Sequence, residues 1–191
     1  RGGLSVIPVK DKKPLLECWK EFQDRSPTRA ELTIWMRRWP DADFAVLTGR
    51  RFIAVDLDTD EAMAFAASEL PTTPMKQKTP RGEHWFYSVD SSVTANSAGA
   101  GVDIRASGGY LVMQPSTGYQ LSWDERRGLP DFDRLPALSR EDVLAIDAFR
   151  NGKKTLRSSN TVVEGERNST ITRYVGGMVS DGLSGEELLS K

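Results

Sequence analysis

Two aspartates separated by a single apolar residue are the clearest chemical signal in the sequence. Residues 52–58 read Phe-Ile-Ala-Val-Asp-Leu-Asp, a pattern typical of a strand, in which alternate side chains point to opposite faces. Asp56 and Asp58 would then project together, and their carboxylates repel each other unless a cation lies between them. Mg²⁺ and Mn²⁺ prefer carboxylate oxygens, so the segment predicts a divalent-metal site. The alternative is a strand that runs into the acidic N-terminus of a helix at residues 59–61.

The only histidine, His84, follows a Pro/Gly turn and opens an aromatic strand. Lys76, Lys78 and Arg81 flank that turn. A histidine beside basic side chains could donate hydrogen bonds to a triphosphate. The alternative is a lone histidine that packs among aromatic side chains for structural reasons.

A third carboxylate, Asp103, lies between two apolar residues, and Arg105 shares its face of the predicted strand. This aspartate could complete a cation site, or it could form a surface ion pair with Arg105 that contributes little to stability. The Gly108-Gly109 pair that follows permits a tight turn or the close approach of a ligand to the backbone. For the glycines alone, an ordinary hairpin is the simpler explanation.

Short strands separated by turn residues are predicted to carry these side chains. Residues 48–51 form a turn, so the segments before and after it are expected to be a hairpin-like pair of strands. The order strand–helix–strand–strand–strand favours an α+β fold with a mixed sheet over a doubly wound parallel sheet. The predicted strands are residues 4–10, 44–47, 52–58, 84–89, 101–105 and 110–113.

Two helices are predicted in the first 70 residues. The first begins with a capping box formed by Thr28 and Glu31 and ends at Pro40. The second covers residues 60–70 and has Thr59 as its N-cap. Four apolar residues of the first helix fall at helical spacing and are expected to pack inward. They are Leu32, Trp35, Met36 and Trp39.

The character of the sequence changes after residue 138, where we expect a domain boundary. Residues 1–138 would form the catalytic domain. Residues 139–191 would comprise a helix from Ser139 to about Arg150, a basic linker and a further helical segment. The chain begins with an arginine rather than a methionine and ends in a predicted helix start, so we expect a fragment of a longer protein.

The composition indicates a globular protein. Of its 191 residues, 38% are hydrophobic and 28% charged, which permits a packed core. No membrane-spanning segment or signal peptide is evident, so no membrane partner is expected. A single cysteine excludes an internal disulfide and a cysteine-rich zinc site. The balance of 26 Lys+Arg against 27 Asp+Glu neither indicates nor excludes a nucleic-acid partner.

Taken in order, these features resemble the archaeo-eukaryotic primase superfamily, specifically the bifunctional primase-polymerase domain of phage and plasmid replication proteins. The family's Asp-hydrophobic-Asp motif matches residues 56–58, and its histidine before an aromatic strand matches His84. Its third motif, a hydrophobic residue followed by an acidic one, matches Val102-Asp103. The resemblance covers roughly residues 5–135. Further family-like residues are Gly118, Tyr119 and Trp123.

The chain departs from the family at the position two residues before the histidine. The family usually has serine there, and this chain has Gly82. A phosphate contact through a hydroxyl at this position is therefore not expected. The chain has no Cys/His cluster for the zinc-binding insertion of some relatives, so we predict none.

The resemblance implies a sheet of the RNA-recognition-motif type, with the active site on its open face and a short helical tail after it. It implies DNA primase and DNA polymerase activity that uses two Mg²⁺ or Mn²⁺ ions. The residues implied for catalysis and metal binding are Asp56, Asp58 and Asp103. Those implied for nucleotide or primer contact are His84, Arg81, Lys78, Arg105 and Ser116.

The resemblance also implies the partners of the protein. These are a single-stranded DNA template and primer, dNTPs or rNTPs, and a C-terminal helicase module, toward which residues 164–170 would lead. The implied setting is phage or plasmid replication in the cytoplasm of a bacterial host.

Two other function classes fit parts of the sequence. A metal-dependent nuclease or phosphohydrolase could use the same three carboxylates, with His84 activating the water. A catalytically silent module that binds single-stranded nucleic acid could present residues 85–87 for stacking on bases. Neither class explains the three motifs in their order, which favours the primase-polymerase interpretation.

Overall fold

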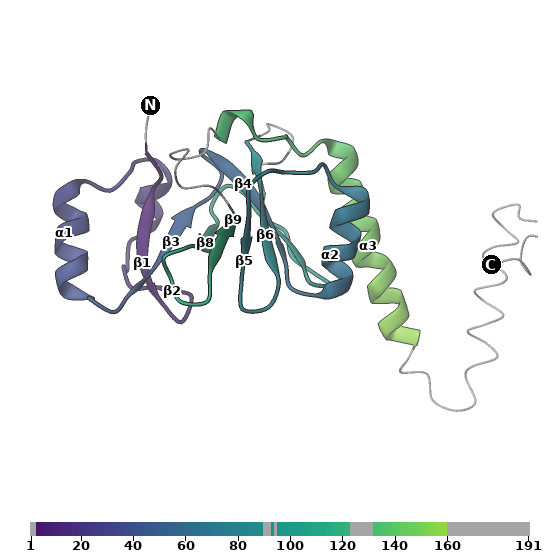
Figure 1. The fold of residues 1–191 in the computed structure, drawn as a ribbon, viewed down its shortest axis with the longest axis horizontal. Helices are drawn as coiled ribbons and strands as arrows, with labels where there is room; N and C mark the ends of the chain where they lie inside the picture. Colours follow the sequence, from purple (N-terminus) through teal and green to yellow (C-terminus); the bar gives the residue numbers. More distant parts are fainter. Residues whose placement is uncertain (1–2, 90–92, 94, 123–131, 160–191) are drawn as a thin grey trace, which may run out of the picture. The chain divides into compact units, whose positions relative to one another are not determined.

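The structure is a computed structural model that describes residues 3–89, 93, 95–122 and 132–159 (Figure 1). The side chains of residue 133 and of residues 153–159 are outside this description. Trp123, residues 164–170 and the helical segment expected near the C-terminus also lie outside the described residues. The chain divides into two compact units, residues 1–150 and 151–191, and the candidate site lies in the first. The domain boundary expected at residue 138 stays a prediction.

The described strands form two sheets in which every strand pair is antiparallel. Their strand orders are β2-β1-β3-β8 and β7-β4-β6-β5-β9. The first sheet consists of β1 (Val6–Lys10), β2 (Lys13–Pro14), β3 (Asp43–Leu47) and β8 (Tyr110–Val112). The second consists of β4 (Phe52–Leu57), β5 (Lys76–Lys78), β6 (Glu83–Ser88), β7 (Val102–Arg105) and β9 (Gln120–Ser122).

The prediction that the strands on either side of residues 48–51 form a hairpin is wrong, because β3 and β4 belong to different sheets. The turn between them is held by the segment that joins β7 to β8. Thr48 donates from its hydroxyl to the Ala106 carbonyl over 2.6 Å and from its amide to the Gly109 carbonyl over 3.1 Å. Gly49 has a φ of +91°, and a Cβ there would collide with Ser107. These contacts carry the chain from one sheet into the other.

Strand β4 is apolar on both faces up to Ala54. The predicted apolar face is confirmed: Ile53, Val55 and Leu57 are fully buried in the core cluster beneath the helices. On the opposite face, Phe52 and Ala54 pack in a second cluster that includes side chains from the first sheet. The first sheet therefore covers only part of this face of the second sheet.

Helix α1 (Arg29–Arg38) begins with the predicted capping box. The Thr28 hydroxyl accepts from the Glu31 amide over 3.2 Å, and the Glu31 carboxylate accepts from the Thr28 amide over 2.7 Å. Trp35 is buried and meets Phe22 edge to face. The inward packing predicted for Met36 is wrong, because this side chain is 61% exposed. The helix buries only a narrow stripe centred on Trp35.

Helices α2 (Asp60–Glu69) and α3 (Arg140–Ser159) cover the other face of the second sheet and lie side by side (Figure 1). Thr59 caps α2 as predicted, since its hydroxyl accepts from the Ala62 amide over 3.1 Å. Helix α3 continues to Ser159, beyond its predicted end near Arg150. Its Phe149 stacks on Phe65 of α2 with 4.4 Å between ring centroids. Two short 3₁₀ helices, Lys20–Gln23 and Phe132–Arg134, complete the described elements.

The α+β class is confirmed. The succession β4–α2–β5–β6–β7 is the predicted order strand–helix–strand–strand–strand, and α3, which follows later in the chain, adds a second helix to the same face of the sheet. None of the described helices is long and apolar enough to cross a membrane.

Candidate active site

Four polar residues from four strands form one row across the second sheet. Gln77 of β5 is paired with His84 of β6, His84 with Asp56 of β4, and Asp56 with Asp103 of β7. Directly opposite residues in antiparallel strands share a face, and their Cβ atoms lie about 4.5–5.5 Å apart. The strand register therefore assembles residues that are distant in the sequence into a single polar line on the face opposite the helices.

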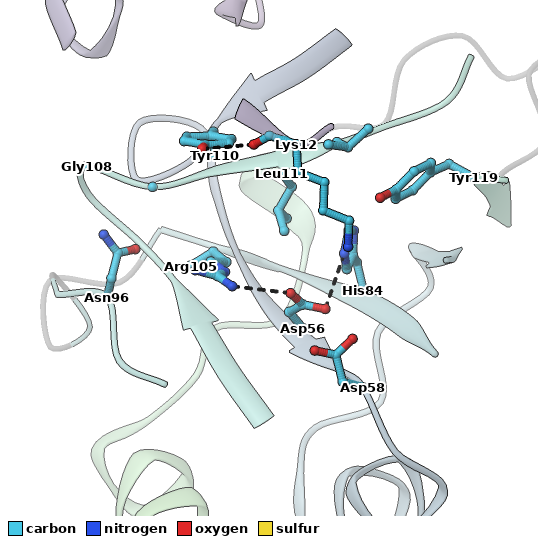
Figure 2. Close-up of a pocket in the computed structure, with 12 residues that line it drawn as sticks. Lys12, Asp56, Asp58, His84, Asn96, Arg105, Gly108, Tyr110, Leu111 and Tyr119 are labelled. Carbon is cyan, nitrogen blue, oxygen red and sulfur yellow. Dashed lines mark hydrogen bonds and ion pairs between the residues drawn. The ribbon is translucent and has the colours of Figure 1, made fainter. Parts of the chain in front are cut away.

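This row borders a pocket with a volume of about 310 Å³. The apolar contact between the two sheets ends after Ala54, and the next residue on the same face of β4 is Asp56. Figure 2 shows the carboxylates of Asp56 and Asp58 side by side at the floor of the pocket. The lining residues with polar or charged side chains include Lys12, Asp56, Asp58, His84, Arg105 and Tyr119.

Asp56 is contacted by two cationic or donor side chains, His84 and Arg105. Its Oδ1 lies 3.3 Å from His84 Nε2, and its Oδ2 lies 3.5 Å from an Arg105 guanidinium nitrogen. Burial alone raises the pKa of Asp56, but the hydrogen bond from His84 and the positive charge of Arg105 outweigh it. The pKa therefore lies below its ordinary value of 3.8, and the group is a carboxylate at neutral pH.

Arg105 joins Asp56 to Asp103. The same guanidinium nitrogen that faces Asp56 lies 2.8 Å from Asp103 Oδ2, and Asp103 Oδ1 accepts from the Gly99 amide over 3.0 Å. The Nε of Arg105 is buried and has no hydrogen-bond partner among the described residues. One cation is therefore held between two carboxylates and keeps an unused donor.

The carboxylates in and beside this pocket fit a divalent cation by their chemistry. Asp56 and Asp103 face each other across adjacent strands, and the space between them already holds a positive group. Oxygen ligands of this kind are those that Mg²⁺ and Mn²⁺ prefer. Within the described ranges, no three acidic, histidine or cysteine side chains converge on one point as a ready metal site. Any metal bound here must compete with Arg105 for carboxylate oxygens.

Four residues predicted for the site do not line the pocket. Asp103 lies on the strand beyond Asp56 and reaches the pocket only through its contact with Arg105. Lys78 follows Lys76 by two positions, and the Lys76 ammonium lies 3.3 Å from the Trp85 ring centroid on the helix-covered face. Arg81 is exposed in the turn between β5 and β6. Ser116 is buried, and its hydroxyl accepts from the Phe44 amide over 3.0 Å.

The glycine at the departure from the family pattern is required by the fold. A Cβ at Gly82 would collide with the backbone carbonyl of Leu57, at the end of β4. The amide of Gly82 donates to the Thr79 hydroxyl over 3.0 Å. The turn before His84 therefore passes too close to the strand that carries Asp56 for a serine to fit.

Two residues beside His84 were not predicted for the site. One comes from the first sheet, and the other bonds to it. Lys12 lies in the turn between β1 and β2, with its backbone carbonyl accepting from the Tyr110 hydroxyl over 3.0 Å, and its side chain extends into the pocket (Figure 2). Gln77 is fully buried and contacts His84 directly. The contact of Gln77 with His84 follows from the pairing of β5 with β6. The burial of Gln77 against the Val112 carbonyl and the approach of Lys12 to the pocket depend instead on how the two sheets meet, which no sequence signal encodes.

Tyr119, which the sequence marked only as family-like, also lines the pocket. Its ring centroid lies 6.1 Å from that of His84. Burial, followed by the negative charges of Asp56, Asp43 and Asp58, raises the pKa of the Tyr119 phenol. The phenol therefore keeps its proton at neutral pH and can donate a hydrogen bond into the pocket.

A family model described as bifunctional DNA primase/polymerase, N-terminal (Prim-Pol), matches residues 1–137, a range that contains the whole polar row. No curated protein matches the chain significantly. The matched range covers well over half of the chain, and the family's description corresponds to nucleotidyl transfer by primases and polymerases in general. The chain therefore belongs to the family of bifunctional DNA primase/polymerase N-terminal domains.

Proposed function

We propose that this chain joins nucleotides on a single-stranded DNA template, as a DNA primase and DNA polymerase, in the pocket bordered by the polar row. The observation that carries the proposal is the cross-strand alignment of His84, Asp56 and Asp103 beside Asp58. Phosphoryl transfer requires positioned negative ligands for metal ions and positioned donors for phosphate oxygens. This alignment provides both kinds of group next to one cavity.

In this proposal Asp56, Asp58 and Asp103 hold two Mg²⁺ or Mn²⁺ ions. When bound, such ions activate the attacking 3′-hydroxyl and offset the charge of the triphosphate and the leaving pyrophosphate. The low pKa of Asp56 keeps its carboxylate charged and ready to bind a cation.

Arg105 has two roles in this proposal. Without metal, its guanidinium neutralises Asp56 and Asp103. If these oxygens held a metal ion, the guanidinium would be free to donate to triphosphate oxygens in the pocket. Its unpartnered Nε is a further donor for that contact.

Lys12, His84 and Tyr119 complete the proposed nucleotide site. Lys12 supplies positive charge within the pocket, and His84 and Tyr119 supply hydrogen-bond donors. Lys78, Arg81 and Ser116 do not line the pocket, so they are proposed for contacts outside it, to the nucleotide, template or primer. The resemblance extends the proposal to phage or plasmid replication in a bacterial host and to a C-terminal helicase module.

The test is the incorporation of labelled dNTPs and, separately, rNTPs on primed and unprimed single-stranded DNA with Mg²⁺ or Mn²⁺. We expect the Asp56→Ala variant to lose incorporation by at least about 100-fold, the scale of removing one preorganised electrostatic group. The matched control is Asp60→Ala, because Asp60 is an exposed aspartate four residues away and does not line the pocket. Retained incorporation by Asp56→Ala would sink the proposal.

The same reaction mixtures separate the two alternatives. Degradation of labelled DNA without incorporation would identify a metal-dependent nuclease that uses these carboxylates. Binding of single-stranded DNA that is independent of metal, with neither synthesis nor degradation, would identify a silent binding module. Products on the unprimed template would add priming to polymerase activity.

A further inference from the structure

We propose that Gln77 fixes the tautomer of His84, so that the imidazole presents an Nε2–H donor to the pocket and cannot act there as a base. Gln77 is thus a positioning residue that acts through His84. The tautomer follows from contacts within the chain alone. Only the identity of the acceptor, a phosphate oxygen of the incoming nucleotide, rests on the proposed function.

The orientation of the Gln77 amide is set by two backbone groups near the end of β8. Its Nε2 donates to the Val112 carbonyl over 3.0 Å, and its Oε1 accepts from the Gln114 amide over 2.9 Å. Turning the amide over would place a carbonyl against a carbonyl and an NH₂ group against an N–H. Gln77 is fully buried, so water cannot rescue the reversed arrangement. The orientation is therefore fixed without reference to the histidine.

This orientation determines which nitrogen of His84 carries the proton. The second hydrogen of Gln77 Nε2 points to His84 Nδ1, which lies 3.0 Å away. An amide NH₂ group can only donate, so Nδ1 must accept, and a ring nitrogen accepts only when it carries no proton. The proton of the neutral ring then lies on Nε2, and an imidazolium would set two N–H groups against each other.

The other side of the ring agrees with this assignment. His84 Nε2 lies 3.3 Å from Oδ1 of Asp56, a carboxylate that only accepts hydrogen bonds. The ring thus has a donor beside Nδ1 and an acceptor beside Nε2, and both contacts require the same tautomer. The ring is buried, with 6% of its side chain exposed.

This tautomer separates the proposed function from the nuclease alternative. Activation of a water molecule requires an unprotonated nitrogen that faces the pocket, whereas Nε2 carries a proton and Nδ1 is occupied by Gln77. A neutral N–H donor suits a phosphate oxygen, the acceptor that a nucleoside triphosphate brings. His84 is therefore a phosphate-contacting donor rather than a general base or a metal ligand.

The test uses the fact that His84 is the only histidine of the chain. Protein labelled with ¹⁵N-histidine and carrying no polyhistidine tag gives the ring signals of this residue alone. A long-range ¹H–¹⁵N correlation spectrum of the metal-free, nucleotide-free protein at neutral pH is expected to show one protonated and one unprotonated nitrogen, in the pattern of the Nε2–H tautomer. An Nδ1–H or imidazolium pattern would overturn the proposal.

Variants of Gln77 test whether this residue is the cause. In Gln77→Glu, a carboxylate oxygen replaces the donor, so the spectrum is expected to change to a pattern with Nδ1 protonated. Gln77→Met removes the donor at similar volume while Asp56 still accepts from Nε2, so a smaller Nε2–H fraction, with some protonation of Nδ1, is expected even if the glutamate variant does not fold. The matched control is Gln120→Glu, the same change at an exposed position of neighbouring β9, which should leave the spectrum unaltered.

A kinetic measurement then connects the tautomer to the nucleotide. In primer extension, Gln77→Met is expected to raise KM for dNTP roughly tenfold, the effect of weakening one hydrogen bond to a charged group. An unchanged Nε2–H spectrum in folded Gln77→Met would refute the role of Gln77. Wild-type protein with the Nε2–H pattern but no incorporation would instead refute the proposed function and leave the tautomer assignment standing.

Discussion

Arg105 occupies the space between Asp56 and Asp103 that a metal ion is proposed to enter. A variant without the positive charge of Arg105 should therefore change metal affinity and nucleotide incorporation in opposite directions. The carboxylates lose a competing cation, which strengthens metal binding. The nucleotide loses a donor, which weakens incorporation. A residue with a purely structural ion pair would not separate the two effects in this way.

We expect Arg105→Gln to bind Mn²⁺ several-fold more tightly than the wild type, because even a solvent-screened ion pair is worth up to about 1 kcal/mol and this one is partly buried. Free Mn²⁺, measured by electron paramagnetic resonance during titration, reports the affinity without any reaction. Incorporation by the same variant should fall. Arg105→Lys, which keeps the charge, serves as the control, and weaker Mn²⁺ binding by Arg105→Gln would contradict the proposed competition.

Among single residues, the sequence identified those whose place in the site follows from their immediate neighbours. Asp56 and Asp58 were identified because their spacing alone places them on one face of a strand, and His84 because it is the only histidine. Lys12 and Gln77 were not identified, because each is an ordinary surface-type residue until the two sheets meet. Long-range packing, rather than composition, gives these two residues their place.

Helix α3 is the element whose importance the family match understates. The match ends at residue 137, yet Ile146 of α3 is fully buried in the same core cluster as Ile53 and Val102. The Arg150 side chain donates to the Val102 carbonyl over 2.8 and 3.0 Å, at the start of the strand that carries Asp103. The first half of α3 therefore packs as part of the same compact unit as the two sheets.

We expect Ile146→Ala to lower the free energy of unfolding by about 2–5 kcal/mol, because it leaves a cavity in the core. Leu144→Ala is a control in the same helix, since Leu144 is 58% exposed, and its effect should stay within about 0.5 kcal/mol. Denaturant unfolding of both variants measures the difference. Equal effects would mean that α3 does not pack on the sheet.

The start of α1 provides a prediction that depends on pH. Glu31 accepts from Arg25 and from the Thr28 amide, and these contacts lower its pKa from 4.5 to about 2. A depressed carboxyl pKa contributes stability that is complete above 4.5 and disappears as the pH falls through about 2. The side chain is exposed, so the contribution is small and salt weakens it.

Glu31→Gln should therefore be less stable than the wild type at pH 6, and the difference should shrink as the pH falls from 4.5 toward 2. Urea unfolding at a series of pH values measures it, and 1 M salt should reduce the difference at pH 6. A difference that grows on acidification would show that the charge of Glu31 does not stabilise α1.

For the molecule as a whole, local sequence patterns predicted the α+β class but not how the strands divide between two sheets. The capping residues, the Ala-rich helix and the alternation in β4 are short-range features, and each was predicted correctly. The hairpin of β3 and β4 was not, because strands with similar alternation can pair with any neighbour. The pairing of β3 with β8 joins residues more than 60 positions apart, and no local signal encodes it.

The cross-strand row also limits which insertions and deletions the protein can tolerate. Because side chains alternate, a one-residue insertion or deletion within β4, β6 or β7 would exchange the two faces of that strand. Such a change in β6 would turn His84 toward the helices and Trp85 toward the pocket, losing the core and the site in one event. We therefore expect changes of length to be tolerated only in the turns, since selection for stability alone would preserve the register that brings the proposed catalytic groups together.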